Sequence, residues 1–396
     1  MDYQLIATTT FGIEAVTARE LKALGYEDLK VENGKIEFEG DEMDIAIANT
    51  WLRTAERVLI KVAEFEARTF EELFEQTTAI DWSGYIPENG EMHVIGKSIK
   101  STLFSVSDCQ AIVKKAIVKS MQRTYDQEIF PEDGPKYKIE VALLKDVVTL
   151  SIDTSGAGLH KRGYRTDTGE APLKETLAAS LVLLARWNFE RLLIDPFCGS
   201  GTILIEAALI ANNIAPGLNR RFVCEDWPNI EADVFEQVRD SAQKAVKPRE
   251  LRLVGYDIDG YVLRKARKNA ENAGVGEMID FHELDFHDFS SKNKYAYLIT
   301  NPPYGERLGE EEEVFRINKK LGQLKNKLDT WDFNIFTSFS RFEKAFGRPS
   351  DKNRKLYNGR ILTRYYQYFD NDLRQKIKAA RLKEAAEPIT EEKKIN

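Results

Sequence analysis

Residues 192–213 read LLIDPFCGSGTILIEAALIANN and decide how the second half of this 396-residue chain folds. The apolar run 192–195 is typical of a buried strand, and the turn DPFCGSG (195–201) leads directly into an apolar helix. Glycines in such a turn let the backbone bend sharply and approach a ligand closely. The turn has neither the GxGxxG spacing of dinucleotide-binding loops nor the Gly-Lys-Ser/Thr of phosphate loops, which argues against both ligand classes.

Strand and helix patterns alternate around this turn. Such alternation predicts a parallel sheet with helices on both faces, whose ligands lie at the carboxyl ends of the strands. We therefore expect an α/β domain over residues 171–375. The other strand candidates lie at 253–258, 279–284, 297–300 and 333–338, and the helical patterns at 173–187, 202–213, 260–273 and 313–328.

The first 155 residues show two smaller α/β patterns. Residues 1–66 follow the order strand, helix, strand, strand, helix, strand, with a hairpin at Asn33-Gly34, which predicts a ferredoxin-like unit. Residues 67–155 form a second α/β unit that ends in a strand pair. The Gly-rich, basic residues 156–170 are expected to be a linker, and residues 376–396 a charged tail.

Composition is that of an ordinary globular protein, with 42% hydrophobic residues and no apolar run long enough for a membrane span. The first residues, MDYQLIATTTF, contain no basic stretch before an apolar run, so we expect no secretory signal and a cytoplasmic location. The three cysteines, and His282 and His287 beside Asp285, lack zinc-site spacing, so no metal is expected. The net charge of −7 does not exclude nucleic acid, because binding depends on local patches.

Carboxylates follow the two strands after the DPFCGSG turn. Asp257, in GYDID (255–259), can accept both hydroxyls of a ribose, whereas Asp259 is well placed to cap the next helix. Asp285 follows the 279–284 strand and could accept the amino group of adenine, although Asp288 could serve instead. These positions predict a nucleoside site at the carboxyl edge of the sheet.

The stretch TNPPYG (300–305) is the most specific motif in the chain. Two successive prolines fix the backbone and remove two N–H donors, and they push Asn301 toward an extended conformation. The Asn301 side-chain oxygen and the Pro302 carbonyl then form a rigid pair of acceptors, which suits the two hydrogens of an amino group. Tyr304 offers an aromatic face for a planar base, and Gly305 leaves room for the substrate.

DPFCGSG, GYDID and TNPPYG, in this order, resemble the Rossmann-like class I methyltransferases that act on amino nitrogens. The resemblance implies base capture by Asn301, Pro302 and Tyr304, and we expect Pro303 to belong to the same catalytic loop. Cys198 lies in the cofactor loop and is expected to be a small buried side chain, not a nucleophile. The residues expected to bind S-adenosylmethionine are Asp195, Phe197, Gly199, Ser200, Gly201, Asp257, Ile258, Asp285 and Asn301.

Further segments resemble the THUMP-containing ribosomal RNA guanine-N2 methyltransferases, in a form without the second methyltransferase domain of fused members. These are GLHKRGYR (158–165), TGEAPLKETLAASL (168–181), LYNGRILTRYYQY (356–368) and residues 1–155 as ferredoxin-like and THUMP domains. The resemblance implies structured RNA as partner, with large-subunit ribosomal RNA or its assembly intermediates as substrate and guanine N2 as target. Open alternatives are guanine N2 in transfer RNA, adenine N6 in DNA or RNA, a protein glutamine amide, and an RNA-binding assembly factor with an inert methyltransferase fold.

Basic residues between 97 and 123 predict a phosphate-binding stripe. Lys115, Lys119 and Arg123 recur every four residues, so a helix places them on one face, while Val113 and Ile117 can pack inward with Met121. Such a stripe contacts phosphates regardless of sequence; charge alone favours a solvated helix face, and the THUMP resemblance favours RNA binding. The residues predicted to bind RNA are Lys97, Lys100, Lys114, Lys115, Lys119, Arg123, Lys161, Arg162 and Arg165.

Overall fold

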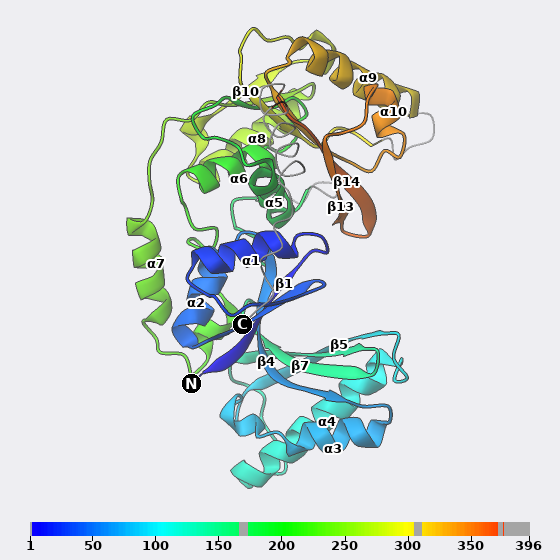
Figure 1. Cartoon of the computed structure of the whole chain (residues 1–396). Coiled ribbons are helices and arrows are strands. Elements are labelled where there is room, and N and C mark those ends of the chain that lie inside the picture. The colour runs from blue at the N-terminus through cyan, green and yellow to red at the C-terminus, as the bar shows by residue number, and fades with distance from the viewer. Residues whose placement is uncertain (1, 166–172, 305–310, 371–374, 376–396) are drawn as a thin grey trace, which may run out of the picture. The chain divides into compact units, whose positions relative to one another are not determined.

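The computed structural model describes residues 2–165, 173–304, 311–370 and 375, and the chain divides into two compact units (Figure 1). Unit 1 comprises Met1–Thr166, Lys174–Ser180 and Leu209–Pro248. Unit 2 comprises Asp167–Leu173, Leu181–Ala208 and Arg249–Asn396. The boundaries expected from the sequence at residues 66, 155, 170 and 375 stay predictions, and the tail at 376–396 lies outside the described residues.

The ferredoxin-like pattern of residues 1–66 has the expected element order. Its strands pair antiparallel in the order β2-β3-β1-β4. Asp41 caps α2, because its side chain accepts from the Asp44 amide while the Asp44 side chain accepts from the Asp41 amide. The elements are β1 (Tyr3–Thr9), α1 (Glu14–Ala23), β2 (Lys30–Glu32), β3 (Lys35–Gly40), α2 (Glu42–Trp51) and β4 (Ala55–Glu66).

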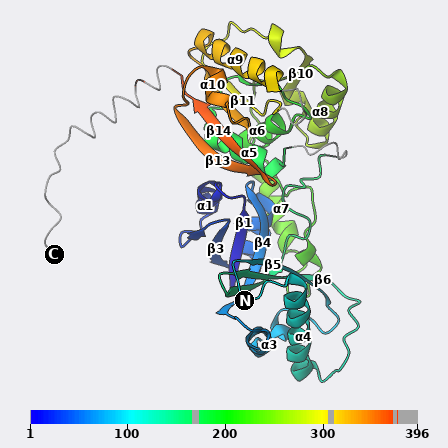
Figure 2. The ribbon, with the colours of Figure 1, turned by 90° about the vertical axis from the view of Figure 1, so that its right-hand side faces the viewer.

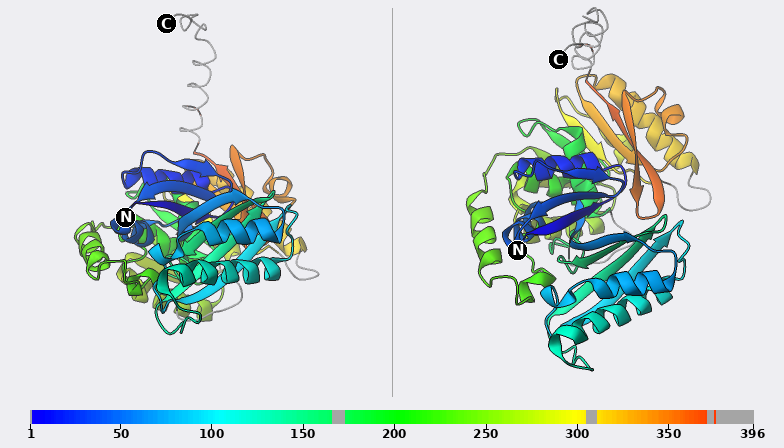
Figure 3. Two further views of the ribbon diagram at one scale, coloured as in Figure 1. Left: turned by 90° about the horizontal axis from the view of Figure 1, so that it is seen from below. Right: turned by 60° about the horizontal axis from the view of Figure 1, so that its bottom comes forward.

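The second pattern continues the same sheet. Strand β4 pairs with β7, so the full order is β2-β3-β1-β4-β7-β6-β5, and a single hydrophobic cluster runs beneath both patterns. Helices α3 and α4 lie side by side (Figure 2, Figure 3). The elements are α3 (Phe70–Ala79), β5 (Glu91–Ile99), α4 (Val106–Tyr125), β6 (Lys136–Leu144) and β7 (Val147–Asp153).

Residues 214–250, to which the sequence assigned no element, complete the core of unit 1. Helix α7 (Val234–Lys244) contacts α2, and its residues Val234, Phe235 and Val238 join the hydrophobic cluster. Trp227 stacks on Tyr137 with ring centroids 4.6 Å apart, and its Nε1 donates to the Lys136 carbonyl at 2.9 Å. This segment therefore belongs structurally with residues far earlier in the chain.

Residues 154–155 and the described part of the expected linker, 156–165, belong to unit 1 and are hydrogen-bonded within it. Thr154 and Ser155 are buried, and their hydroxyls donate to the Val58 carbonyl at 2.7 Å and to Asn49 Oδ1 at 2.6 Å. The Arg220 guanidinium binds the carbonyls of residues 157, 158 and 161 at 2.6–3.0 Å. Residues 154–165 are thus held in place by unit 1, while the linker expected at 156–170 stays a prediction because residues 166–170 lie outside the described residues.

Unit 2 contains the parallel sheet expected from the alternating pattern. Strands β10, β9, β8, β11 and β12 run parallel, and β14 pairs antiparallel with β12 and β13. The hairpin of β13 and β14 was not assigned as strands from the sequence. The strands are β8 (Leu193–Asp195), β9 (Leu253–Asp257), β10 (Ile279–Glu283), β11 (Tyr297–Thr300), β12 (Asp332–Thr337), β13 (Lys352–Asn358) and β14 (Ile361–Tyr368).

Helices cover this sheet through alternate residues of its strands. Ile194 and Leu298 cluster with Leu321 of α9. Phe281 of β10 and Ala266 of α8 both lie close to the position that a Cβ on Gly201 would take. The helices are α5 (Glu175–Ala185), α6 (Thr202–Ala211), α8 (Gly260–Asn272), α9 (Glu311–Lys327) and α10 (Phe342–Phe346). Among the helices of the described residues, none has the length and apolarity that a membrane crossing requires.

Candidate active site

The carboxyl ends of β10, β9, β8 and β11 meet at one edge of the unit 2 sheet. The strand order reverses between β8 and β11, and in open α/β sheets the ligand crevice lies at such a point. A cleft of about 430 Å³ opens here. It brings together eight of the residues predicted for the site, namely Phe197, Asp257, Ile258, Asp285, Asn301, Pro302, Pro303 and Tyr304.

The turn after β8 is shaped by its glycines and by Asp257. Gly199 and Gly201 have φ of +52° and +81°, a region that side chains other than glycine rarely adopt. A Cβ on Gly201 would also lie 3.0 Å from Phe281 Cζ. The Gly199 amide donates to Asp257 Oδ2 at 2.9 Å, which ties the turn to the end of β9. Gly199, Ser200 and Gly201 thus set the backbone of the turn, and their contact with a cofactor stays a prediction.

Asp195 lies behind the turn. Its side chain is 1% exposed and accepts from Thr300 Oγ1 at 2.6 Å and from the Phe197 amide at 3.1 Å. Burial raises the pKa of Asp195 to about 7, and the negative charge of Asp257 acts in the same direction. This carboxyl therefore joins the end of β8 to the end of β11, next to Asn301, while direct cofactor contact by Asp195 stays a prediction.

The half-buried carboxylates Asp257 and Asp285 follow the ends of β9 and β10. Asp259 caps α8, because its side chain accepts from the amides of Tyr261 and Val262, and this leaves Asp257 as the carboxylate that faces the cleft. Asp285 lines the cleft too and accepts from the His287 amide at 2.8 Å. Ile258 is 66% exposed and lines the cleft, where its apolar side chain suits an aromatic ligand.

The TNPPYG corner lies on the β11 side of the same cleft. Pro302 is buried and Pro303 is exposed. The Tyr304 hydroxyl donates to the Asn301 side-chain oxygen, which has a second lone pair for a further donor. Gly305 lies outside the described residues. Cys198 is buried, which raises the pKa of its thiol and agrees with a packing role.

Sequence reasoning missed part of the cleft wall. Phe286 packs against Phe197 with ring centroids 4.7 Å apart, and His287 Nε2 lies 3.2 Å from Glu313 Oε1. Phe286 and His287 directly follow Asp285, so their position could have been inferred. Glu313 and Ile317 come from α9, and no motif signals their approach. Within the described residues, no group of three or more His, Cys, Asp or Glu side chains is arranged to hold a metal ion.

These features fit a nucleoside cofactor. Carboxylates at the ends of β9 and β10 offer acceptors for ribose hydroxyls and an amino group, and Ile258, Leu284 and Phe286 offer an apolar wall between them. Asn301 and Pro302 add acceptors across the cleft. Such a site can hold a nucleoside on one side and a second planar, amino-bearing group on the other.

The predicted basic stripe lies on α4 in unit 1. Lys115 and Lys119 are exposed and have no ion pair among the described residues, and Val113, Ile117 and Met121 are fully buried, as predicted. Other predicted RNA contacts have protein partners: Lys97 with Glu140 at 2.6 Å, Lys114 with Glu132 at 2.9 Å, and Arg123 with the Thr78 carbonyl. Lys100 is exposed.

The second predicted basic group, in residues 158–165, is mostly engaged. Arg162 is 5% exposed and donates to the carbonyls of Leu159 and Arg53, and its predicted contact with phosphate stays a prediction. Arg165 lies 3.6 Å from Glu175, and Lys161 is exposed.

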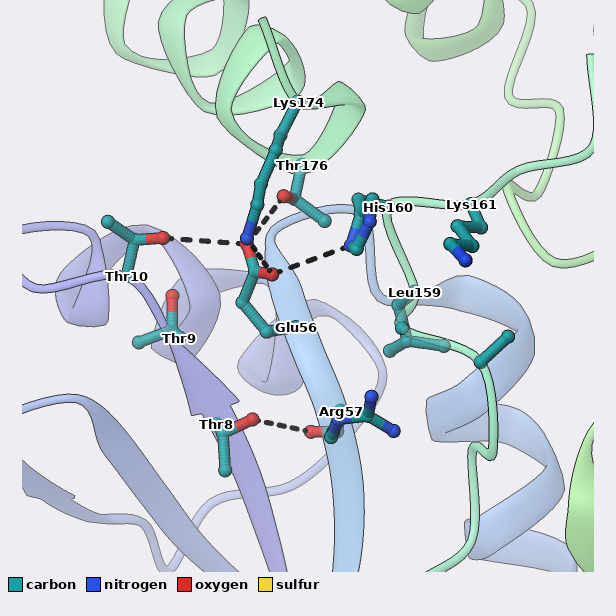
Figure 4. A network of polar contacts seen from close by, with 12 residues as sticks. Thr8, Thr9, Thr10, Glu56, Arg57, Leu159, His160, Lys161, Lys174 and Thr176 are labelled. Carbon is teal, nitrogen blue, oxygen red and sulfur yellow. Dashed lines mark hydrogen bonds and ion pairs between the residues drawn. The ribbon is translucent and has the colours of Figure 1, made fainter. Parts of the chain in front are cut away.

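Nearby, Glu56 gathers three partners from around this segment (Figure 4). It accepts from Lys174 at 3.0 Å and from Thr176 at 2.7 Å, and lies 3.7 Å from His160. Burial opposes ionisation, but His160, Thr176 and Lys174 together lower the pKa of Glu56 to about 2. These contacts hold residues 158–165 and the start of α5 within unit 1.

Comparisons with known proteins match nearly the whole chain. The RlmL ferredoxin-like domain matches residues 4–59, the THUMP domain residues 67–153, and the RMKL-like methyltransferase domain residues 162–367. The Bacillus subtilis protein named "Putative RNA methyltransferase YpsC" is 52% identical over 370 residues, which are 93% of this chain and 96% of that protein.

Two solved structures are similar to this chain over 93% of its length. A Listeria monocytogenes structure described as a predicted N6-adenine-specific DNA methylase is 49% identical, with a TM-score of 0.88, and the match covers 93% of this chain and 96% of that one. The structure of SMU.472, described as a putative methyltransferase complexed with SAH, is 43% identical, with a TM-score of 0.88 and coverage of 93% and 98%.

Proposed function

Because the chain belongs to the RMKL-like family of RNA methyltransferases, with RlmL ferredoxin-like and THUMP domains, we propose that it methylates the exocyclic N2 of a guanine in large-subunit ribosomal RNA. Its cofactor is S-adenosylmethionine. The substrate is the ribosomal RNA or one of its assembly intermediates, in the cytoplasm. The observation that supports the proposal is the common cleft of Asp257, Asp285, Asn301 and Pro302.

Residues at the ends of β9 and β10 hold the cofactor in this proposal. Asp257 accepts the ribose hydroxyls with the lone pairs that its bonds to the Gly199 and Asp259 amides leave free. Asp285 accepts the adenine amino group, and Ile258 packs against the adenine ring. The bound cofactor supplies a methyl group on a sulfonium, which is already reactive enough to need only a correctly placed acceptor.

The TNPPYG corner positions the amine that receives the methyl group. The Asn301 side-chain oxygen and the Pro302 carbonyl accept the two hydrogens of the amine, and the Tyr304 ring stacks on the base. Asn301 has no basic atom, so it orients and polarises the amine and does not remove its proton. Alignment of this kind can lower a barrier by roughly 7–11 kcal/mol.

The two hydrogen-bond acceptors, the Asn301 side-chain oxygen and the Pro302 carbonyl, do not by themselves distinguish one exocyclic amine from another. Guanine N2 in transfer RNA and adenine N6 in RNA or DNA fit them equally, and the Listeria structure's description names adenine N6 in DNA. The THUMP domain at residues 67–153 favours RNA over DNA. A protein glutamine amide would fit the same two hydrogen-bond acceptors. An assembly factor with an inert methyltransferase fold would not require these acceptors, so their presence favours an enzyme.

Comparison of modified nucleosides tests the proposal. Large-subunit RNA, small-subunit RNA, transfer RNA and DNA are isolated from cells with and without the gene and digested, and N2-methylguanosine and N6-methyladenosine are quantified by mass spectrometry. We expect one N2-methylguanosine per large-subunit RNA to disappear and to return with the wild-type gene. Loss confined to transfer RNA, or to N6-methyladenosine, would replace the proposed substrate by that alternative.

A further inference from the structure

An exposed aromatic ring lies in the loop between β5 and α4 of unit 1. Phe104 is 82% exposed, although its neighbour Leu103 is 6% exposed and packs into the hydrophobic cluster. Because Leu103 fixes the direction of the loop between β5 and α4, the next side chain points away from the core. Ile99 and Leu144, paired across β5 and β6, are also more than half exposed at this end. Nothing in the packing of unit 1 requires a phenylalanine here.

The loop that carries Phe104 is held by hydrogen bonds to the turn between β6 and β7. Ser98 Oγ donates to the Leu103 carbonyl at 2.7 Å. The Thr102 amide donates to Asp146 Oδ1 at 2.6 Å, and the Asp146 amide donates to Ser101 Oγ at 3.0 Å. A ring on a fixed loop loses little conformational entropy when it binds a flat partner.

Cationic side chains surround this loop. Lys100 and Lys145 are exposed and have no ion pair among the described residues. Arg68 lies 3.6 Å from Asp146, Lys97 pairs with Glu140, and the exposed acid nearest in sequence is Asp108 in the first turn of α4. Lys97, Leu144 and Lys145 also line a cleft of about 510 Å³, whose wall includes Glu32, Glu64 and Glu140 as well.

We propose that Phe104 is a stacking platform for an unpaired nucleotide of the RNA substrate, with Lys100 and Lys145 contacting the adjacent phosphates. Every base offers a face to an aromatic ring, and lysines supply the sequence-independent attraction to phosphate. The base must be unpaired, because both faces of a base inside a duplex are already stacked. This inference rests on the proposed function for the identity of the ligand as RNA.

The test measures how tightly the full chain binds a labelled single-stranded RNA and a hairpin duplex of the same length. Phe104→Ala is expected to weaken single-strand binding about tenfold and to leave duplex binding unchanged, whereas Phe104→Trp keeps the affinity. Ile129→Ala is the matched control, because Ile129 is 83% exposed on the loop after α4, among acidic neighbours. Lys100→Gln with Lys145→Gln should lower the salt dependence of single-strand binding by roughly 2 in slope.

A tryptophan reporter separates stacking from general weakening. Tryptophan fluorescence is recorded for each variant, and the wild-type fluorescence is subtracted. Single-stranded RNA should quench the fluorescence added by Phe104→Trp and should leave the fluorescence added by Ile129→Trp unchanged. Equal affinities for Phe104→Ala and the wild type, in a chain that methylates RNA, would overturn the stacking site and leave the proposed function standing. A wild-type chain that neither binds nor methylates RNA would overturn both.

Discussion

At the scale of single residues, the hydrogen bond from Thr300 to Asp195 connects the strand that precedes Asn301 with the strand that precedes the DPFCGSG turn. Neither residue is exposed, and the bond of 2.6 Å joins the end of β8 to the residue before Asn301. Thr300→Val would leave a buried carboxyl without this donor, so we expect a loss of about 1–3 kcal/mol in the free energy of unfolding. Urea titration checks this, and Thr300→Ser, which restores the hydroxyl, should recover the loss. A variant as stable as the wild type would contradict the role of the bond.

The raised pKa of Asp195 gives a pH dependence whose sign is fixed. The unfolded carboxyl titrates near ~3.9, and the folded one at about 7. Between these values the folded state binds the extra proton, so this group's contribution to stability is lost as the pH rises from about 4 to about 7. Relative to Asp195→Asn, the wild type should lose about 1.4 kcal/mol per pH unit in this window and nothing further above it. Urea unfolding of both proteins across that range measures the difference, and parallel curves would contradict the assignment.

Residue roles could be inferred from the sequence where a motif fixes local geometry. TNPPYG and GYDID placed Asn301, Pro302 and Asp257 correctly at one cleft, because parallel strands end at a common edge. The burial of Arg162 was not foreseen, because its guanidinium donates to the carbonyls of Leu159 and Arg53 and a basic segment alone does not reveal such partners.

At the scale of elements, α4 carries the phosphate-binding hypothesis. Lys115 and Lys119 project from one helical face, so Lys115→Glu with Lys119→Glu should weaken RNA binding and lower its salt slope by roughly 2. The matched control is Lys244→Glu with Lys247→Glu, which reverses two exposed lysines at the end of α7. Filter binding at several salt concentrations measures both. An equal effect of the two pairs would mean that net charge, and not this stripe, governs binding.

The elements that the sequence analysis missed pack against partners that local periodicity does not reveal. Helix α7 buries Val234, Phe235 and Val238 in a cluster formed mainly by residues before 155, so its partner is distant in the chain. The pair β13 and β14 lies at the sheet edge, where β14 runs against the parallel direction that the rest of the pattern indicated. Periodicity identifies a face but not the surface that covers it.

At the scale of the whole molecule, the sequence resolved the order of the domains better than their structural extent. The ferredoxin-like and THUMP patterns were expected as separate domains, yet β4 and β7 join them in one sheet. Residues 154–165 looked like a linker because they are rich in glycine and basic residues, but Arg220 and Asn49 hold them in place. Their glycines serve close packing and turns in this segment.

The central claim is that one cleft holds the methyl donor and that Asn301, although expected among the cofactor-binding residues, acts by holding the amine that receives the methyl group. The most direct measurement pairs calorimetry of S-adenosylmethionine binding with single-turnover methyl transfer to ribosomal RNA, in the wild type and in Asn301→Ala. The account predicts an unchanged cofactor affinity and a rate reduced by about 10²–10³, as for the loss of one positioned hydrogen-bonding group in other active sites. An Asn301→Ala chain that transfers methyl at the wild-type rate would contradict it, as would a wild type that binds no cofactor.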